Sequence, residues 1–305
     1  MTTESMTTDN PARAGNKRVL YIVNPISGRG RCNILETLIE NYSDNRRIDF
    51  DIAYTKSARH AVEISNRSCQ QYDAIVAAGG DGSINEVAQS LIDTDTALGV
   101  IPNGSGNGFA RHLKIPMKLE KAIKVINNFS TTRIDTGVLN GHPFVNIAGI
   151  GFDARIAHKF AVFGKRGFLS YAKISITELL KFTPLDVRIT TDSERQETVA
   201  FLFSVANGSQ FGNNAYIAPE ACMQDGRLDV VLLKEFPYIS APALVGHLFS
   251  KTFDKSDYAD IRKAAHIVLE KKGEILAHLD GEPYTFQDKI DIKVRPASLQ
   301  VIVPR

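Results

Sequence analysis

Short apolar runs alternate with helical patterns over the first part of the chain, from about residue 17 to residue 130. The runs 19–23, 73–78 and 98–101 consist mostly of Val, Ile, Leu and Ala, as strands buried on both faces do. After each run, apolar residues recur with the spacing of one helix face. A further strand at 50–55 precedes a helical pattern over 58–70. These repeated strand–helix units predict an α/β domain with a parallel sheet over 17–130.

A different pattern begins near Thr131. The segments 134–139 and 144–148 flank Asn140-Gly141, a dipeptide typical of a two-residue hairpin turn. Two helical patterns, 168–182 and 241–249, interrupt the extended segments that follow. Those segments cover 186–190, 199–205, 228–233, 265–269 and 290–294. The pattern predicts a mostly antiparallel second domain, a β-sandwich over 131–294.

Three of the predicted parallel strands end in glycine-rich loops. Strand 19–23 leads into Asn24-Pro25-Ile26-Ser27-Gly28, strand 73–78 into Gly79-Gly80-Asp81-Gly82-Ser83, and strand 98–101 into Pro102-Asn103-Gly104-Ser105-Gly106-Asn107-Gly108. The carboxyl ends of parallel strands lie at one edge of a sheet, where open α/β sheets bind ligands. Backbone N–H groups at the start of a helix suit phosphate. The three loops together therefore predict a nucleotide site.

Asp81 is unusual inside such a loop, because a carboxylate repels phosphate. The acid is explained if it holds a metal ion or accepts a proton from a substrate hydroxyl. A tight turn that contains Asp-Gly and has no chemical role is the alternative.

Composition narrows the class of protein. The 305 residues are 43% hydrophobic and 23% charged, as in a globular protein with a sizeable core. The formal net charge of +2 gives no signal for nucleic acid. Cys32, Cys69 and Cys222 lie far apart, which favours a reducing cytoplasm. No apolar run approaches the roughly 20 residues of a membrane span, and the polar residues 1–16 predict a disordered tail rather than a signal peptide.

Other motifs fit less well. The chain lacks the Gly-x-x-x-x-Gly-Lys-Ser/Thr pattern of P-loop kinases and the Gly-x-Ser-x-Gly pattern of a nucleophile elbow. Gly149-x-Gly151-x-x-Ala154 matches a loose dinucleotide fingerprint, but it follows a hairpin strand rather than opening a strand–helix–strand unit. The seven histidines show no metal-ligand spacing, and a Ser–His–Asp triad stays open.

The motifs resemble those of the diacylglycerol kinase catalytic-domain family, which includes bacterial soluble lipid kinases, sphingosine kinases and ceramide kinases. In the first half the resemblance rests on Asn24-Pro25…Gly28, Gly79-Gly80-Asp81-Gly82-Ser83 and Gly104-Ser105-Gly106-Asn107…Phe109-Ala110-Arg111. In the second half it rests on Asn146…Gly149-Ile150-Gly151-Phe152-Asp153, Ala218-Pro219…Asp225-Gly226…Leu228-Asp229 and Leu279-Asp280-Gly281-Glu282-Pro283. It covers almost everything from residue 17 onward. It implies phosphoryl transfer from ATP to a lipid hydroxyl, and a final strand, within 295–305, that returns to the first domain.

The resemblance also implies how ATP is bound. Main-chain amides of the loops would hold the phosphates, Asn24 and Ser105 would add side-chain hydrogen bonds, and Thr55 matches a threonine that contacts the nucleotide. The implied nucleotide-binding residues are Asn24, Thr55, Gly79, Gly80, Asp81, Gly82, Ser83, Ile84, Asn85, Gly104, Ser105, Gly106 and Asn107. Mg²⁺ on the phosphates would be organised through Asp81.

Acids of the second domain match the family's catalytic residues. Glu282 matches the acid proposed as proton acceptor for the lipid hydroxyl, and Asp280 would assist it. Sphingosine kinases are argued instead around the glycine-loop acid, which is Asp81 here. Whether Glu282 or Asp81 is the base therefore stays open.

A structural magnesium site is implied by the same resemblance. Asp225 matches the family's magnesium ligand, and main-chain carbonyls near Cys222 and Arg227 would complete the site. Oxygen ligands suit this hard cation. Asp229 is either a neighbour of that site or simply a charged strand residue.

Departures from the family pattern bear on the acceptor. Serine stands at 83 and 105, where the family often has threonine, and Gly108 stands where many bacterial relatives carry Asp. The change at Gly108 leans toward the sphingosine kinase pattern. Diacylglycerol is the first expected acceptor, and a sphingoid base or another lipid alcohol is the alternative. An NAD kinase-like enzyme, whose fold also uses a Gly-Gly-Asp-Gly loop, and a catalytically silent lipid-binding regulator stay open.

A lipid substrate implies contact with a membrane surface. The segment 159–169 interleaves Lys159, Lys165 and Arg166 with large apolar residues, which suits an anionic lipid interface. A loop leading into a core helix is the alternative. The expected location is cytoplasmic and peripheral at the inner membrane surface. The expected partners are ATP, a membrane lipid and a transient membrane contact, without nucleic acid, and a homodimer is left open.

Overall fold

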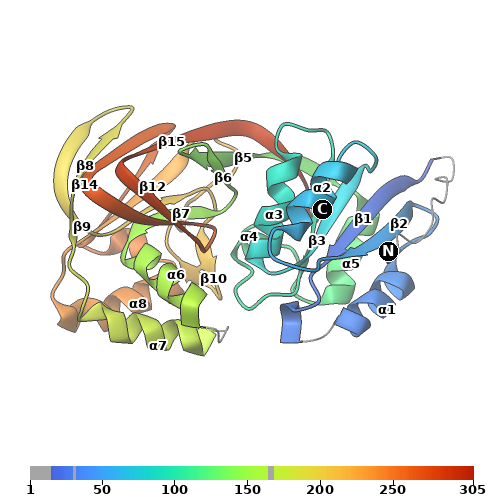
Figure 1. Ribbon diagram of the computed structural model, residues 1–305, viewed down its shortest axis with the longest axis horizontal. Helices are drawn as coiled ribbons and strands as arrows, with labels where there is room; N and C mark the ends of the chain where they lie inside the picture. Colours follow the sequence, from blue (N-terminus) through green and yellow to red (C-terminus); the bar gives the residue numbers. More distant parts are fainter. Residues whose placement is uncertain (1–14, 30–31, 164–167) are drawn as a thin grey trace. The chain divides into compact units, whose positions relative to one another are not determined.

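The computed structural model describes residues 15–29, 32–163 and 168–305, and it divides into two compact units. Unit 1 comprises residues 1–134 and 298–305, and unit 2 comprises residues 135–297. The sequence pattern predicts these borders near 130/131 and 294/295. Almost all of the predicted tail 1–16 lies outside the described residues. Figure 1 shows the ribbon of both units, and each is described below by itself.

Unit 1 is the predicted α/β domain with a parallel sheet. Its strands are β1 (Lys17–Val23), β2 (Ile48–Tyr54), β3 (Ala74–Gly79) and β4 (Ala97–Pro102), in the spatial order β4-β3-β1-β2. Each neighbouring pair is parallel. The last strand of the chain, β15 (Glu282–Ile302), adds Val301 beside Leu98 of β4, also in parallel.

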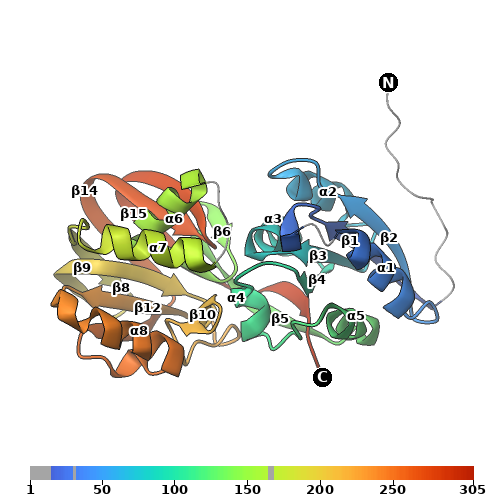
Figure 2. The ribbon, with the colours of Figure 1, turned by 90° about the horizontal axis from the view of Figure 1, so that it is seen from below.

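Helices cover both faces of this sheet. Helix α2 packs against α3 on one face, and α1 packs against α5 on the other, as Figure 2 shows. The helical segments are η1 (Ser27–Arg29), α1 (Cys32–Tyr42), α2 (His60–Ser68), α3 (Asp81–Leu91), α4 (Gly108–His112) and α5 (Leu119–Asn128). With both faces covered, all six residues of β3 and of β4 are buried, which explains why these strands appear in the sequence as unbroken apolar runs.

Unit 2 is mostly antiparallel, as the sequence pattern predicts. Its main sheet follows the order β13-β12-β9-β7-β14-β15, while β8 pairs with β9 and β14. The strands are β5 (Thr131–Leu139), β6 (His142–Phe144), β7 (Ile147–Gly151), β8 (Leu185–Thr191), β9 (Arg195–Ala206), β12 (Leu228–Lys234), β13 (Ala259–Ala264), β14 (His266–Leu279) and β15. A small separate sheet pairs β10 (Gln210–Gly212) with β11 (Ala215–Tyr216).

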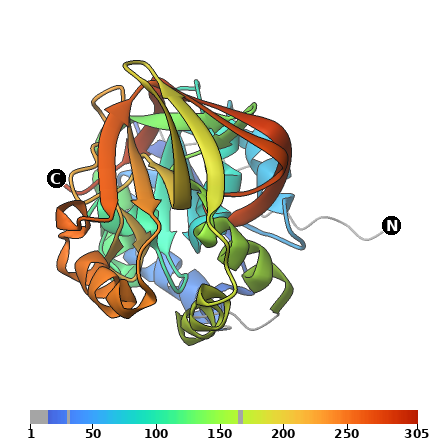
Figure 3. The same ribbon diagram turned by 90° about the vertical axis from the view of Figure 1, so that its left-hand side faces the viewer.

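Two cores form in unit 2 because its central strands are buried on both faces. On β12, Val230 and Leu232 enter one apolar cluster, and Val231 and Leu233 enter another. This alternation follows from the two-residue period of a strand. The second cluster also takes residues from the helical segments α6 (Phe152–Phe163), α7 (Phe168–Leu179), η2 (Tyr238–Ser240), α8 (Ala241–Ser250) and η3 (Phe253–Lys255) or the chain next to them. Figure 3 shows the strands of unit 2 with the helices along one side.

The Asn140-Gly141 hairpin is confirmed, but its second strand is shorter than predicted. Leu139 pairs with His142, and Asn140 and Gly141 have φ of 46° and 84°, the positive values that a type I′ turn needs. Strand β6 then ends at Phe144, and β7 starts at Ile147 and joins β9 and β14 instead. The break occurs because the intervening backbone amides bind a carboxylate rather than a neighbouring strand.

Helix α6 and the strands β10, β11 and β13 were not predicted from the pattern. Helix α6 directly follows the Gly149-Ile150-Gly151 stretch and includes the start of the segment 159–169, and β13 forms the edge beside β12. Within the described ranges, no helix has both the length and the apolar character needed to cross a bilayer.

Candidate active site

Three loops meet at the carboxyl edge of the unit 1 sheet, as predicted. They follow β1, β3 and β4, and hydrogen bonds between their side chains connect them. The amide of Asn24 donates to Ser83 Oγ at 3.1 Å, and the amide of Asn103 donates to Ser27 Oγ at 3.3 Å. The backbone N–H of Asn103 donates to Gly79 O at 2.8 Å. The loops therefore form one polar rim rather than three separate turns.

Glycines allow the second and third loops to approach backbone to backbone. A Cβ atom added at Gly104 would lie 2.5 Å from Gly80 Cα and 2.8 Å from the side-chain oxygen of Asn107. In the first loop Gly28 has φ of 64°, and a methyl group there would overlap the side chain of Asn103. Side chains at these positions would separate the loops, so glycine is required by the close approach.

Asp81 is the first residue of α3. Gly80 precedes it with an extended backbone (φ −92°), and the first N–H groups of the helix have no acceptor within the helix. This helix end carries the positive end of the helix dipole, which suits an anion. One carboxylate oxygen of Asp81 accepts the N–H of Phe109, at the start of α4, at 3.4 Å. The acid thus lies between the starts of two helices, both in unit 1.

The other predicted nucleotide-binding residues fall into two groups. Ser105 is exposed and Gly106 lies beside it in the third loop. Gly79 ends β3, Gly80 precedes α3, and Gly82 and Ser83 lie in the first turn of α3. In contrast, Asn107 is 7% exposed, and its side chain bonds both the N–H and the carbonyl of Gly104 at 2.9 Å. Asn107 therefore braces its own loop.

Three further predicted contacts are buried in unit 1. Ile84 and Asn85 lie on the inner face of α3, and the side-chain oxygen of Asn85 accepts a hydrogen bond from Gln89. Thr55 follows β2 and is 9% exposed, with its N–H bonded to Val23 O at 3.0 Å. The side chains of Ile84 and Asn85 thus face the interior of unit 1, whereas Thr55 marks the carboxyl end of a fourth parallel strand.

In unit 2, Asp280, Gly281 and Glu282 form the tip of the β14–β15 hairpin. Leu279 pairs with Glu282, and Asp280 and Gly281 have φ of 50° and 89°. The Asp280 carboxylate accepts three backbone N–H groups, those of Val145, Asn146 and Ile147, at 2.8–2.9 Å. These bonds connect the hairpin tip to the chain between β6 and β7. The structure thus gives Asp280 a bracing contact, and it leaves Glu282 half-buried beside the turn.

The predicted magnesium ligand Asp225 has partners within the protein. One of its carboxylate oxygens accepts the N–H of Arg227 at 3.1 Å, and the other pairs with the ammonium of Lys263. Lys263 also lies 4.0 Å from the carboxylate of Asp229. Burial raises the pKa of Asp229 to about 6, with Lys263 opposing this shift and Asp225 and Glu220 adding to it.

The pairing of Asp225 with Lys263 affects how well Mg²⁺ would fit at Asp225. A cation bound by Asp225 would have to replace Lys263, which already supplies a positive charge. Over the ranges that the structure describes, no group of three or more His, Cys, Asp or Glu side chains is placed to hold a metal ion. The predicted site, with carbonyls near Cys222 and Arg227, thus has one carboxylate, and a lysine competes for it.

Sequence reasoning missed Asp135, which supports the Asp225 loop. Asp135 is 3% exposed, and its carboxylate accepts the N–H of Gly226 at 2.8 Å and that of Ala297 at 2.7 Å. Its own N–H donates to Met223 O at 2.6 Å. The residue lies within an ordinary strand pattern, so no local signal indicates its role.

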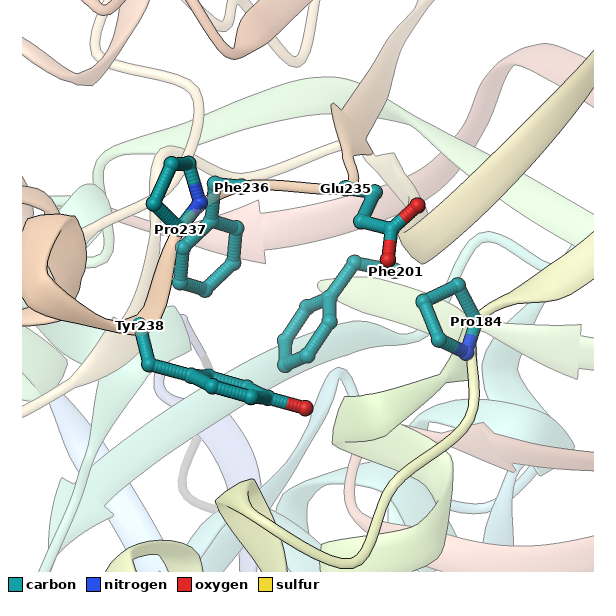
Figure 4. Close-up of a pocket in the computed structure, with 6 residues that line it drawn as sticks. All are labelled: Pro184, Phe201, Glu235, Phe236, Pro237 and Tyr238. Atoms are coloured by element: carbon teal, nitrogen blue, oxygen red, sulfur yellow. The ribbon is translucent and has the colours of Figure 1, made fainter.

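Unit 2 also contains a hollow of about 440 Å³. It is lined by Pro184, Phe201, Glu235, Phe236, Pro237 and Tyr238, and Figure 4 shows the three aromatic rings around it. Phe201 and Phe236 pack edge to face, with ring centroids 4.8 Å apart. The hollow lies where β9 and β12 meet the chain next to α7 and α8.

Comparison with known proteins defines the class of protein. The diacylglycerol kinase catalytic domain matches residues 18–139, and the YegS C-terminal NAD kinase beta sandwich-like domain matches residues 146–303. The chain belongs to the diacylglycerol kinase catalytic-domain family, in its two-domain form with the YegS-type sandwich. It is accordingly a kinase of the lipid kinase family, for which ATP is the phosphoryl donor.

Individual relatives agree with this assignment. The chain is 30% identical over 287 residues to the diacylglycerol kinase of Bacillus subtilis, covering 87% of this chain and 92% of the relative. It is 27% identical over 236 residues to a Chromohalobacter salexigens protein named "Probable lipid kinase YegS-like", covering 75% and 76%. Its fold is similar to the crystal structure of a diacylglycerol kinase from Bacillus anthracis, with a TM-score of 0.75, 24% identity, and coverage of 94% and 97%.

Proposed function

We propose that the chain transfers the γ-phosphate of ATP to a lipid hydroxyl, and that diacylglycerol is the preferred acceptor. The observation that carries the proposal is the rim of three glycine loops at one sheet edge, with Asp81 at the start of α3. Such a rim suits a polyphosphate, because backbone N–H groups and a helix dipole point toward it. The name of the Bacillus subtilis relative supports diacylglycerol as the acceptor.

Phosphate binding is assigned to unit 1. The N–H groups at Gly80–Ser83 and the exposed hydroxyl of Ser105 would bind the phosphates, while Asn24 and Asn107 hold the loops in place. Mg²⁺, as the cation that accompanies ATP, would find a carboxylate oxygen at Asp81 and would neutralise charge on the phosphates when bound. Because Asp81 already accepts the N–H of Phe109, we assign it to the phosphate end of the reaction.

Proton transfer is assigned to Glu282 of unit 2. A general base must lie within hydrogen-bond reach of the hydroxyl that it deprotonates. Glu282 is half-buried and matches the acid that the family resemblance implies as the base, whereas Asp280 on the same hairpin bonds three backbone amides. We therefore assign the base to Glu282 and the support of the turn to Asp280.

Two substitutions separate these roles. Asp81→Asn should lower turnover by at least about a hundredfold, because it removes a charge at the phosphate end. Glu282→Gln should lower kcat while leaving the KM for ATP nearly unchanged, because the base acts on the acceptor. A Glu282→Gln enzyme that only binds ATP more weakly would contradict the assignment of the base.

The acceptor is tested with purified protein, labelled ATP and a panel of lipids. The panel contains diacylglycerol, a sphingoid base and ceramide in vesicles, with NAD and buffer as controls. We expect label in phosphatidic acid first. Preferential labelling of the sphingoid base would favour the second candidate, which Gly108 suggests. Labelling of NAD would contradict the proposal and favour an NAD kinase-like enzyme. Binding to vesicles without labelling of any lipid would indicate a catalytically silent regulator.

Contact with a bilayer is the second part of the proposal. The segment 159–169 predicted for it is only partly described, since Lys165 and Arg166 lie outside the described residues. The described part of unit 2 adds exposed apolar side chains on and near α7 and α8. They are Ile176, Leu180, Ile239, Val245 and Phe249, with exposures between 44% and 90%. A lipid interface is the surrounding in which such side chains lose contact with water.

Aspartate substitutions test this contact. Ile239→Asp combined with Leu180→Asp should weaken binding to anionic vesicles by roughly tenfold, since two apolar side chains leave the interface. Activity on vesicle-borne lipid should fall in parallel, while activity on a short-chain soluble analogue should not. Val199→Asp, a change at another exposed apolar residue, is the matched control. Equal losses on both substrates would show that these residues do not serve membrane contact.

A further inference from the structure

A buried polar cluster lies directly beneath the hairpin tip of unit 2. It consists of Asp153 at the start of α6, Ser204 on β9 and His278 on β14, which are 4%, 0% and 5% exposed. Asp153 Oδ2 accepts the hydroxyl of Ser204 at 2.6 Å and faces His278 Nε2 at 3.3 Å. Its other oxygen accepts the N–H of Ala154 at 2.8 Å. Every polar atom of the Asp153 carboxylate therefore has a partner in the protein.

Gly149 provides the space for this cluster. A methyl group in place of its hydrogen would overlap the carboxylate of Asp153 and the imidazole of His278. Gly149 also pairs with His278 between β7 and β14, so the two backbones are in register at this point. The Gly149-x-Gly151-x-Asp153 motif is thereby explained without a cofactor: its first glycine makes room for an Asp–His pair.

The hydrogen bonds fix the tautomer of His278. The N–H of Gly281 donates to Nδ1 at 3.3 Å, so Nδ1 carries a lone pair rather than a proton. Nε2 then carries the proton and donates it to Asp153. A carboxylate on one ring nitrogen determines in this way what the other nitrogen can do, as in other histidine–carboxylate pairs.

Gly281 is the residue immediately before Glu282. It has φ of 89°, and its backbone N–H donates to Nδ1 of His278. The neighbouring carboxylate of Asp280 accepts backbone N–H groups at 145–147. A second histidine, His158 of α6, donates through Nε2 to Ala277 O at 3.1 Å and Tyr284 O at 3.0 Å, on the two strands of the same hairpin. Helix α6 thus supports the hairpin both at its tip and along its strands.

We propose that His278 is a positioning residue that orients Glu282 by holding the N–H of Gly281, and that Asp153 and Ser204 keep its imidazole in the required tautomer. The inference rests on the proposed role of Glu282 as the base. Because the cluster is buried, it acts on the acceptor side of the reaction only through the hairpin. It predicts no contribution to ATP binding, since the phosphate loops all belong to unit 1.

A hydrolase triad does not account for the same residues. In such a triad the serine hydroxyl bonds to histidine, which activates it as a nucleophile. Here the hydroxyl of Ser204 bonds to Asp153, and Ser204 is fully buried. The serine therefore locks the carboxylate and is not available to a substrate.

Two substitutions of His278 separate its two hydrogen bonds. His278→Asn places an amide oxygen near the position of Nδ1, so it can still accept the N–H of Gly281, whereas His278→Gln retains a donor toward Asp153 and loses that acceptor. We expect His278→Gln to lower kcat for lipid phosphorylation by roughly tenfold to a hundredfold, because small displacements of a catalytic group have effects of this size. His278→Asn should recover most of that loss.

The KM for ATP and the melting temperature are measured for both variants. His266→Asn, at a partly exposed histidine on the same strand, is the control and should leave kcat unchanged. Equal losses of kcat in the Asn and Gln variants, or a rise in the KM for ATP with unchanged kcat, would overturn the proposal. Since both variants retain one buried hydrogen bond, the comparison remains useful if bulkier replacements do not fold.

A readout that does not need kinase activity separates this inference from the proposed function. ¹⁵N NMR of the wild-type imidazole should show His278 Nε2 protonated and Nδ1 unprotonated, and Asp153→Ala, which removes the acceptor at Nε2, should weaken that preference. Protonation at Nδ1 in the wild type would overturn the proposed tautomer. If the tautomer is as expected but no lipid is phosphorylated, the proposed function fails while the hairpin support stands.

Discussion

Unit 1 and unit 2 both present polar loops, but they stabilise them by different means. In unit 1 the loops approach through backbone, with Gly80 against Gly104, and the polar groups are N–H groups at a helix start. In unit 2 the buried carboxylates of Asp135 and Asp153 and the half-buried carboxylate of Asp280 bind backbone amides or a histidine. A site for phosphate must keep most of its amides available, and in unit 1 the carboxylate of Asp81 accepts one of them, that of Phe109. A site for proton transfer needs one acid held still, and buried polar contacts can do that.

The comparison is tested most strongly at Asp280. Asp280→Asn should lower the free energy of unfolding by about 2–4 kcal/mol, because three backbone amides lose a charged acceptor. Chemical denaturation measures this loss. Asp288→Asn is a matched control, since Asp288 also has a positive φ of 58° but accepts one amide in an exposed turn. A similar loss in both variants would show that the three amides add nothing.

At Gly104 we expect a somewhat smaller effect, confined to nucleotide binding. Gly104→Ala would place a methyl group 2.5 Å from Gly80 Cα, so the two loops must separate. Calorimetric titration should show ATP affinity reduced on the order of tenfold to a hundredfold, which corresponds to about 1.4–2.7 kcal/mol. Gly246→Ala, where a Cβ atom meets nothing, is the control. Unchanged ATP affinity would show that the approach of the loops is not needed for binding.

His112, at the end of α4 in unit 1, should make stability depend on pH. Burial lowers its pKa to about 4, and Lys114 adds to the shift. Because the folded pKa lies below the ordinary value of 6.5, protons bind the unfolded chain more readily than the folded protein. The free energy of unfolding is therefore highest above pH 6.5 and decreases as the pH falls toward 4. His112→Gln should therefore flatten the decline in unfolding free energy between pH 6.5 and 4.5 by about 1–2 kcal/mol. An identical decline in the variant would contradict this.

The smallest expected effect concerns Lys263. Lys263→Met leaves the carboxylates of Asp225 and Asp229 without their cation, so added Mg²⁺ should stabilise the variant more than the wild type. We expect a gain of about 1 kcal/mol or less at millimolar Mg²⁺, measured as a shift in melting temperature. Lys293→Met, which breaks the exposed pair with Asp291, should show no such gain. Equal responses would show that Lys263 does not compete with magnesium.

The sequence by itself determined the class of fold and the three glycine-rich loops at one sheet edge. Strands buried on both faces need continuous apolar runs, and β3 and β4 show them; a positive φ at two successive residues needs a pair such as Asn140-Gly141. Glycine where two backbones touch is equally visible, as at Gly104. Each of these requirements acts on residues close together in the chain, so each leaves a local pattern.

Only the tertiary structure decided which polar residues brace the second unit. Asp280 bonds amides 133–135 positions away, and His278 meets Asp153 across 125 positions. Contacts between such distant residues depend on how β7, β9 and β14 come together, and they leave no periodic signal. The same contacts account for the early end of the predicted strand 144–148, since its amides at 145–147 bind Asp280. A local pattern predicts what the backbone can do alone, whereas the partner of a buried side chain is set by the packing of the whole unit.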